Sequence, residues 1–161
     1  MSVDFLWPVA TNPGQEKLLA DVREYGCHIL NVAGDGRSDF SYSVGLYANY
    51  GHPEIVILGL PSATAMGLIN MVRDRAASGA PVEDGTMADG LARGYPVAFV
   101  SVEQEHFVDR FGFANWFYRA LPAGEFPVLQ LVWPDRQGLF PWHAAFDPGL
   151  RPVQPVLRRI V

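Results

Sequence analysis

The spacing of apolar residues along the chain predicts about three helices and about five strands. Helical spacing covers residues 13–25, the segment from 62 to 78, and residues 111–121. Alternating or continuous apolar runs cover residues 27–33, 40–46, 55–60, 97–102 and 126–133. The interleaved order predicts an α+β fold, with a mixed or antiparallel sheet of about five strands and about three packed helices. We expect a single domain over residues 1–161, which is long enough for a sizeable core.

Residues at the helix ends support two of these helices. Asn12 suits the N-cap, Pro13 suits the first helical position, and Gln15 is placed to reach back toward the cap. Gly26 is expected to end this helix. Ser62 is expected to cap the second long helix in the same way.

Several segments lack a regular pattern. Residues 1–11 are interpreted as a loosely held N-terminal arm, and residues 148–161 as a C-terminal tail that docks on the body or on a second subunit. Residues 80–95 are rich in Gly and Asp without clear periodicity, so a mobile lid or binding loop is expected there. A turn at residues 34–36 joins the first two strands into a hairpin.

The run at residues 126–133 is expected to lie inside the sheet, because both of its faces are apolar. Gln130 falls within this run. Its amide must find hydrogen-bond partners, since burying it unpaired costs about 1–3 kcal/mol.

The turn that follows, residues 134–138, has two interpretations. In the first, it is a packed turn in which Asp135 bonds the local backbone and Arg136 is solvated. In the second, Trp133 and Trp142 wall a pocket that has Asp135 and Arg136 at its mouth.

A second candidate segment, His52-Pro53-Glu54, precedes the strand at residues 55–60. It lies on a loop, and its imidazole and carboxylate are suited to acid–base chemistry. The alternative is structural, with His52 bonded to a backbone carbonyl and Glu54 paired with an arginine.

Two further positions carry candidate ligand contacts. Tyr42 lies on the large apolar face of its strand, whereas Ser41, Ser43 and Gly45 form a small face that a packed helix or a flat ligand can approach closely. Asn70 lies beside the apolar stripe of the second long helix, where an amide ties down a loop or contacts a ligand.

The composition limits the classes of binding partner and the cellular compartment that we expect. Hydrophobic residues make up 49% of the chain and charged residues 18%, which is a globular composition. The net charge of −5 does not favour a nucleic-acid partner. One cysteine excludes an internal disulfide and fits a reducing cytoplasm, and we expect no signal peptide and no membrane span. The four histidines are scattered, so no metal site is expected.

Three motifs carry a resemblance to a known family. They are Phe-Ser-Tyr-Ser-Val-Gly-Leu at 40–46, Gly-His-Pro-Glu-Ile-Val-Ile-Leu-Gly-Leu-Pro at 51–61, and Leu-Gln-Leu-Val-Trp-Pro-Asp-Arg-Gln-Gly-Leu-Phe-Pro-Trp at 129–142. With them the chain resembles the bacterial domain-of-unknown-function 4262 family from about Gln15 to Trp142. The resemblance implies no particular activity, and the sequence does not identify a cofactor. It implies that the following residues occupy family-pattern positions: Tyr42, Gly45, His52, Pro53, Glu54, Asn70, Gln130, Trp133, Asp135 and Trp142. Leu139 stands where the pattern leads us to expect Arg or Lys.

Three functional hypotheses follow. The first is a small cytoplasmic binding protein, with a homodimer as one assembly, whose pocket lies between the His52-Pro53-Glu54 loop and the Trp133–Arg136 turn. Its partner is a small molecule or a protein, as for an antitoxin-like or immunity-like module. The second is a hydrolase in which His52 is the general base, Glu54 or Asp135 orients it, and Arg136 stabilises an anion. The third is a split-barrel-like flavin binder that uses the small strand face.

Overall fold

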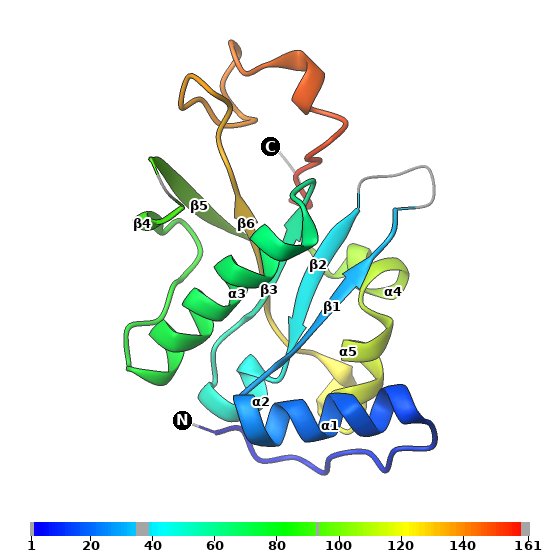
Figure 1. The fold of residues 1–161 in the computed structure, drawn as a ribbon. Coiled ribbons are helices and arrows are strands. Elements are labelled where there is room, and N and C mark those ends of the chain that lie inside the picture. Colours follow the sequence, from blue (N-terminus) through cyan, green and yellow to red (C-terminus); the bar gives the residue numbers. More distant parts are fainter. Residues whose placement is uncertain (1, 35–38, 93, 159–161) are drawn as a thin grey trace.

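A six-stranded mixed sheet forms the centre of the protein (Figure 1). The computed structural model describes residues 2–34, 39–92 and 94–158. The strands are β1 (His28–Val32), β2 (Phe40–Val44), β3 (Glu54–Leu58), β4 (Met87–Ala92), β5 (Tyr95–Ser101) and β6 (Val128–Val132). They lie side by side in the order β1-β2-β3-β6-β5-β4.

The central strands β3 and β6 run parallel, whereas the other neighbouring pairs run antiparallel. Glu54 pairs with Val128 at one end of the parallel pair. Because the two strands run in the same direction, the residues before them meet at one end of the sheet. The residues that follow them meet at the opposite end, and this separates the two candidate segments.

Helices pack on both faces and at one end of the sheet. They are α1 (Pro13–Tyr25), α2 (Leu46–Tyr50), α3 (Ser62–Ala77), α4 (Phe107–Arg110) and α5 (Gly112–Phe117). Short 3-10 turns cover Gln104–His106, Pro122–Gly124 and Pro148–Leu150. The predicted α+β class is confirmed. Within the described residues the sheet has one strand more than expected, and five α-helices replace the expected three.

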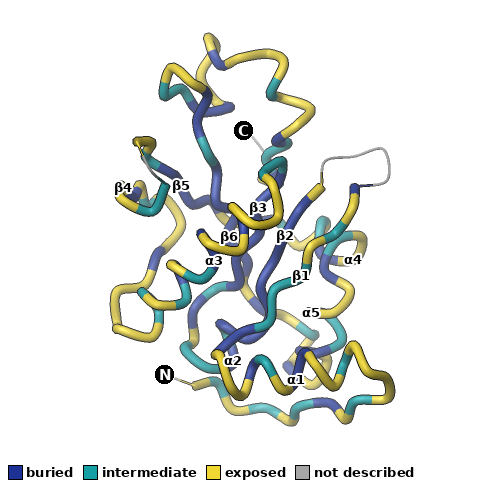
Figure 2. The backbone as a smooth tube through the Cα atoms, viewed as in Figure 1, coloured by how far each residue is buried: buried dark blue, intermediate teal, exposed yellow. Residues whose placement is uncertain are grey.

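The sheet separates two apolar layers. On one face, α3 buries Ile69 and Val72 against Ile57, Phe99 and other sheet residues. On the other face, the aromatic residues of α4 and α5 pack with side chains of β2, β3 and β6. Figure 2 shows the central strands as the most continuously buried part of the chain, and every residue of β2, β3 and β6 is buried. The prediction that the strand after Phe126 lies inside the sheet is confirmed.

The small face of β2 accommodates helices, as one of its two interpretations proposed. Ser41 pairs with Ile57 and lies on the face that α3 covers. Gly45 has a φ of 115°, and a Cβ at this position would come within 2.8 Å of the Val22 side chain in α1. A glycine is therefore needed both for the backbone conformation and for the approach of α1.

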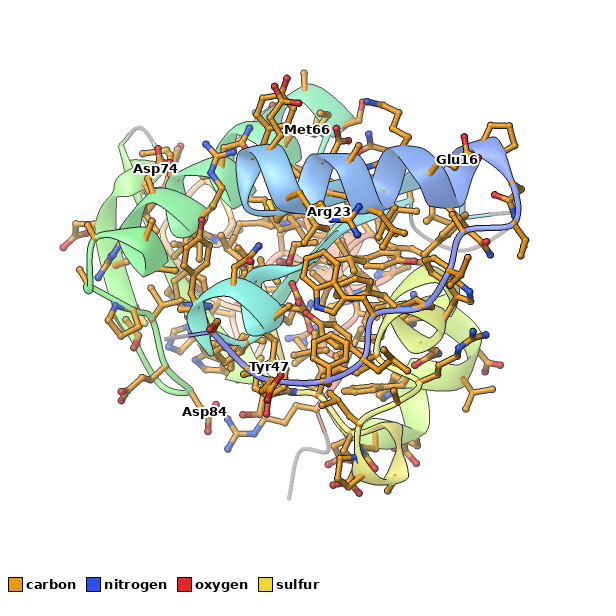
Figure 3. All side chains as sticks on the ribbon, turned by 90° about the horizontal axis from the view of Figure 1, so that it is seen from below. Glu16, Arg23, Tyr47, Met66, Asp74 and Asp84 are labelled. Atoms are coloured by element: carbon orange, nitrogen blue, oxygen red, sulfur yellow. The ribbon has the colours of Figure 1, made fainter. Side chains whose placement is uncertain are left out.

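The N-terminal arm, α1 and α2 lie together across one end of the sheet, as Figure 3 shows from below. Phe5 and Trp7 pack against the ring of Phe117, and the backbone N–H of Val3 donates to the carbonyl of Ala48. The prediction of a loosely held arm is wrong, because these aromatic contacts fix the segment. Isolated aromatic residues without periodicity gave no indication of this docking.

The predicted start of the first helix is confirmed. The side chain of Asn12 accepts from the backbone N–H of Gln15, and Gly26 ends the helix in the left-handed conformation. The Gln15 side chain reaches back to the N–H of Thr11. The predicted cap of α3 is wrong, because Ser62 is the first helical residue and the position before it is a proline.

The strand β4 and the short helices α2 and α4 were not predicted. The strand β4 lies within residues 80–95, which lack periodicity because β4 contains a register shift and Gly90 with a φ of 86°. Its pairing with β5 comes from tertiary structure rather than from its own residues. The short helix α2 begins at Leu46, where the sequence predicted the end of a strand. In the predicted turn at 34–36, positions 35 and 36 lie outside the described residues.

The C-terminal segment docks on β6. Leu157 is buried in the same apolar layer as α4 and α5. Gln130 accepts from the N–H of Leu157 and donates to the carbonyl of Pro155, at 2.8 and 3.0 Å. The predicted need for partners at Gln130 is thus met by the chain's own C-terminal segment.

Candidate functional site

The two candidate segments lie at opposite ends of the parallel strands. Glu54 is the first residue of β3 and pairs with the first residue of β6, whereas Trp133 directly follows the last residue of β6. Five residues of strand at about 3.3 Å each separate these ends. The predicted common pocket between the His52-Pro53-Glu54 loop and the Trp133–Arg136 turn is therefore not formed. Each segment borders a hollow of its own.

Glu54 is buried and hydrogen-bonded on all sides. Its oxygens accept from the hydroxyl of Ser43 at 2.7 Å and from the backbone N–H groups of Gly45, Leu46 and Tyr47 at 3.0–3.1 Å. The hydroxyl of Tyr118 donates to the same carboxylate. The predicted arginine partner is replaced by these neutral donors. Glu54 therefore holds the turn from β2 into α2.

Burial controls the protonation of this cluster. Removal from water raises the pKa of Glu54, and the hydrogen bonds from Tyr118, Tyr47, Ser43 and Gly45 partly oppose the rise. Burial also raises the pKa of Tyr118 well above its ordinary value, and the adjacent carboxylate adds to this. The Tyr118 hydroxyl consequently stays protonated and serves as a donor.

His52 is engaged through both ring nitrogens. Nε2 lies 3.0 Å from the backbone N–H of Val82 and can only accept there, so Nδ1 carries the proton and donates to the carbonyl of Pro53 at 2.7 Å. Burial lowers the pKa of His52, which favours the neutral ring that this arrangement requires. The structural alternative given for His52 matches this geometry. Neither Glu54 nor Asp135 orients the ring, so the predicted catalytic pairs are not formed.

Asp135 organises its own turn. Oδ1 accepts from the N–H groups of Gln137 and Leu139, both at 2.9 Å, and Oδ2 accepts from the N–H of Asp147 at 3.0 Å. Burial opposes ionisation of Asp135, but these three backbone donors outweigh it and lower its pKa. The first interpretation of the turn, with Asp135 as its cap, is confirmed.

Several predicted ligand contacts have structural roles instead. Gln130 is bonded to the C-terminal segment, and Tyr42 is buried with its hydroxyl accepting from the N–H of Phe113. Asn70 accepts from the guanidinium of Arg73. Trp142 is 43% exposed and stacks on a neighbouring phenylalanine, and it does not line the groove described next.

An apolar groove of about 680 Å³ lies between α3, the β4–β5 hairpin and the turn after β6. Four chain segments that are distant in sequence supply its walls. The lining residues are Leu60, Ala63, Thr64, Gly67, Leu68, Met71, Leu91, Ala92, Tyr95, Val97, Trp133, Pro134, Asp135, Arg136 and Leu150. Of the predicted site residues, the groove brings together Trp133, Asp135 and Arg136. The second interpretation matches the structure only in part, because a groove lies beside the turn but Trp142 does not line it.

Trp133 forms a fixed wall of this groove. Its indole N–H donates to the carbonyl of Leu58 at 2.8 Å. Its backbone N–H and carbonyl are bonded to the side-chain amide of Gln154, at 2.9 and 2.8 Å. Gly59 lets the C-terminal segment come this close, because a Cβ there would lie 2.6 Å from the carbonyl of Val153.

Two residues that line the groove were not predicted as site residues. Gly67 stands in the middle of α3, and a Cβ built there meets no atom within 4 Å. A glycine in a helix interior usually has a packing or functional reason, and this was the available signal. Tyr95 begins a strand beside the unpredicted β4 and is 42% exposed. Its place at the groove follows from a strand pairing that the pattern did not reveal.

The structure defines a class of α+β protein with a mixed open sheet. A buried glutamate lies at one end of the central parallel strands, and an apolar groove lies at the other end. The chain belongs to the family described as a domain of unknown function (DUF4262), whose model matches residues 21–147. No curated protein and no solved structure matches the chain. No group of three or more His, Cys, Asp and Glu within the described ranges is arranged to hold a metal ion. No described helix is long and apolar enough to cross a membrane.

Proposed function

We propose that the protein binds a small, largely apolar molecule in the groove between α3, the β4–β5 hairpin and the turn after β6. The observation that carries this proposal is the groove itself, about 680 Å³ in volume. Ligand sites typically measure about 300–1,000 Å³ and are lined mainly by apolar and aromatic side chains with a few polar groups. The lining here has that composition.

The apolar contacts come from residues that are only partly covered. Met71 is 38% exposed and Tyr95 42% exposed, and both border the groove together with the indole of Trp133. A ligand that covers these side chains gains about 25 cal/mol for each Å² of apolar surface removed from water. Methionine also adapts its shape to different ligands. These features favour an apolar ligand over a strongly polar one.

The groove is also preorganised on the side of the turn. Trp133 is fixed by three hydrogen bonds, and the adjacent Asp135 closes its turn with three more. A wall that is already ordered loses little conformational freedom when a ligand binds, which preserves affinity.

The hydrolase alternative receives no support from the predicted residues, because His52 and Glu54 are fully engaged in structural hydrogen bonds. The flavin alternative relied on Ser41, Ser43 and Gly45, all of which are buried, with α3 on the serine face and α1 against the glycine. The cytoplasmic location and the homodimer stay predictions from the sequence. The buried free cysteine, Cys27, agrees with a reducing compartment.

The test uses N-phenyl-1-naphthylamine, a neutral apolar dye whose fluorescence rises when it leaves water. Gly67→Ala and Gly67→Trp form a matched pair, because position 67 lines the groove and has free space around it. An indole that displaces about 60 Å² of dye contact should weaken binding by about tenfold. Alanine should leave the dissociation constant unchanged.

The result that contradicts the proposal is equal binding by both variants, or no saturable binding by the wild type. Urea unfolding of each variant is the control, because a partly unfolded chain also binds apolar dyes. If a second copy of the chain covers the groove instead, dye binding will weaken as protein concentration rises. Gly67→Trp will then shift the protein toward monomer.

A further inference from the structure

We propose that the ligand of the groove carries one anionic group, and that Arg136 is the residue that contacts this group. This inference rests on the proposed function and adds the chemical class of the ligand. The observation behind it is a cation at a largely apolar site that has no partner among the residues the structure describes.

Arg136 borders the groove, whereas several other described arginines lie elsewhere and have partners of their own. Arg73 bonds Asn70 and Asp74, and Arg151 bonds two backbone carbonyls. Arg158 pairs with Asp84. Arg136 is exposed and makes no hydrogen bond or ion pair with any residue that the structure describes. A guanidinium beside an apolar groove is suited to a carboxylate, sulfonate or phosphate, which it can bind through two parallel hydrogen bonds.

The neighbouring carboxylate, Asp135, is bonded to backbone N–H groups and does not pair with Arg136. Asp135 is the acidic residue in the lining of the groove, and both of its oxygens already accept backbone N–H groups. Those three donors surround the negative charge and hold it within the turn. Thr64 and Tyr95, whose side chains carry neutral hydroxyl donors, also line the groove. The lining thus offers donors to an anion, and the oxygens of its one carboxylate are occupied by backbone N–H groups.

The test compares two dyes that differ by one sulfonate: the neutral N-phenyl-1-naphthylamine and the anionic 8-anilinonaphthalene-1-sulfonate. The variants are Arg136→Gln and, as the matched control, Arg119→Gln. Arg119 is also exposed, has no side-chain partner among the described residues, and follows α5 on the other side of the sheet. Both substitutions remove one positive charge, so the control reports any effect of net charge.

We expect Arg136→Gln to raise the dissociation constant of the anionic dye about two- to fivefold, which is the loss typical of an exposed ion pair. The neutral dye should bind Arg136→Gln as it binds the wild type, and Arg119→Gln should bind both dyes normally. The inference is wrong, while the proposed function stands, if Arg136→Gln changes the affinity for both dyes equally or for neither dye. The same holds if its affinities for the two dyes equal those of Arg119→Gln. If the wild type binds neither dye, the proposed function fails and the inference fails with it.

Discussion

Glu54→Gln provides the sharpest test of how this fold is held together. The substitution keeps the size of the side chain but replaces one acceptor oxygen with an amide NH₂ group. In the least costly orientation the NH₂ replaces Oε1, where it faces the hydroxyl of Ser43 and the backbone N–H of Leu46. Two buried donors then lose their acceptor. At about 1–3 kcal/mol for each unpaired donor, the free energy of unfolding should fall by about 2–6 kcal/mol.

The other orientation is worse, because Oε2 accepts from Gly45, Tyr47 and Tyr118. The assay is urea unfolding followed by circular dichroism, with Glu125→Gln as the matched control. Glu125 is exposed, so the same chemical change there should alter stability by less than about 0.5 kcal/mol. If Glu54→Gln is as stable as Glu125→Gln, then the five donors do not hold the carboxylate and the account of this end of the sheet is wrong.

Three further changes have defined outcomes. Gly67→Ala should raise the free energy of unfolding by about 0.5–1 kcal/mol, because alanine is the best helix former and has free space at this position inside the helix. A lower urea midpoint would contradict this. His52 has a lowered pKa in the folded state, so the unfolded chain binds more protons below about pH 6.5 and stability should fall as pH drops through that value. Unfolding at pH 5.5 and 7.5 should show a smaller fall for His52→Gln than for the wild type, and equal falls would count against the assignment. Gln154→Ala should cost about 1–3 kcal/mol, because it removes both amide bonds to the backbone of Trp133; an unchanged thermal midpoint would show that those bonds contribute nothing.

Hydrogen bonds between a side chain and the backbone of nearby residues could be predicted from the sequence. Asn12 caps α1, and Asp135 closes its turn through the N–H groups two and four residues on. The need for partners at Gln130 was also predictable, because a polar side chain in an apolar strand must be satisfied. The identity of those partners was not, since they lie 25 and 27 residues further along the chain.

The site could not be assembled from the sequence because it depends on strand order. The residues of β3 and β6 do not indicate that these strands pair in parallel. Because they do, the His52 loop and the Trp133 turn lie at opposite ends of the sheet. Tyr118 joins the Glu54 cluster from 64 residues away, and no spacing rule connects the two. The groove needs β4, whose irregular residues adopt a strand through pairing with β5.

Side-by-side dye titrations of Gly67→Ala and Gly67→Trp test whether the groove beside Trp133 is a binding site. The account predicts saturable binding of N-phenyl-1-naphthylamine to the alanine variant and a dissociation constant about ten times higher for the folded tryptophan variant. Identical titration curves for two equally folded variants would contradict it, because the dye would then bind somewhere other than the groove.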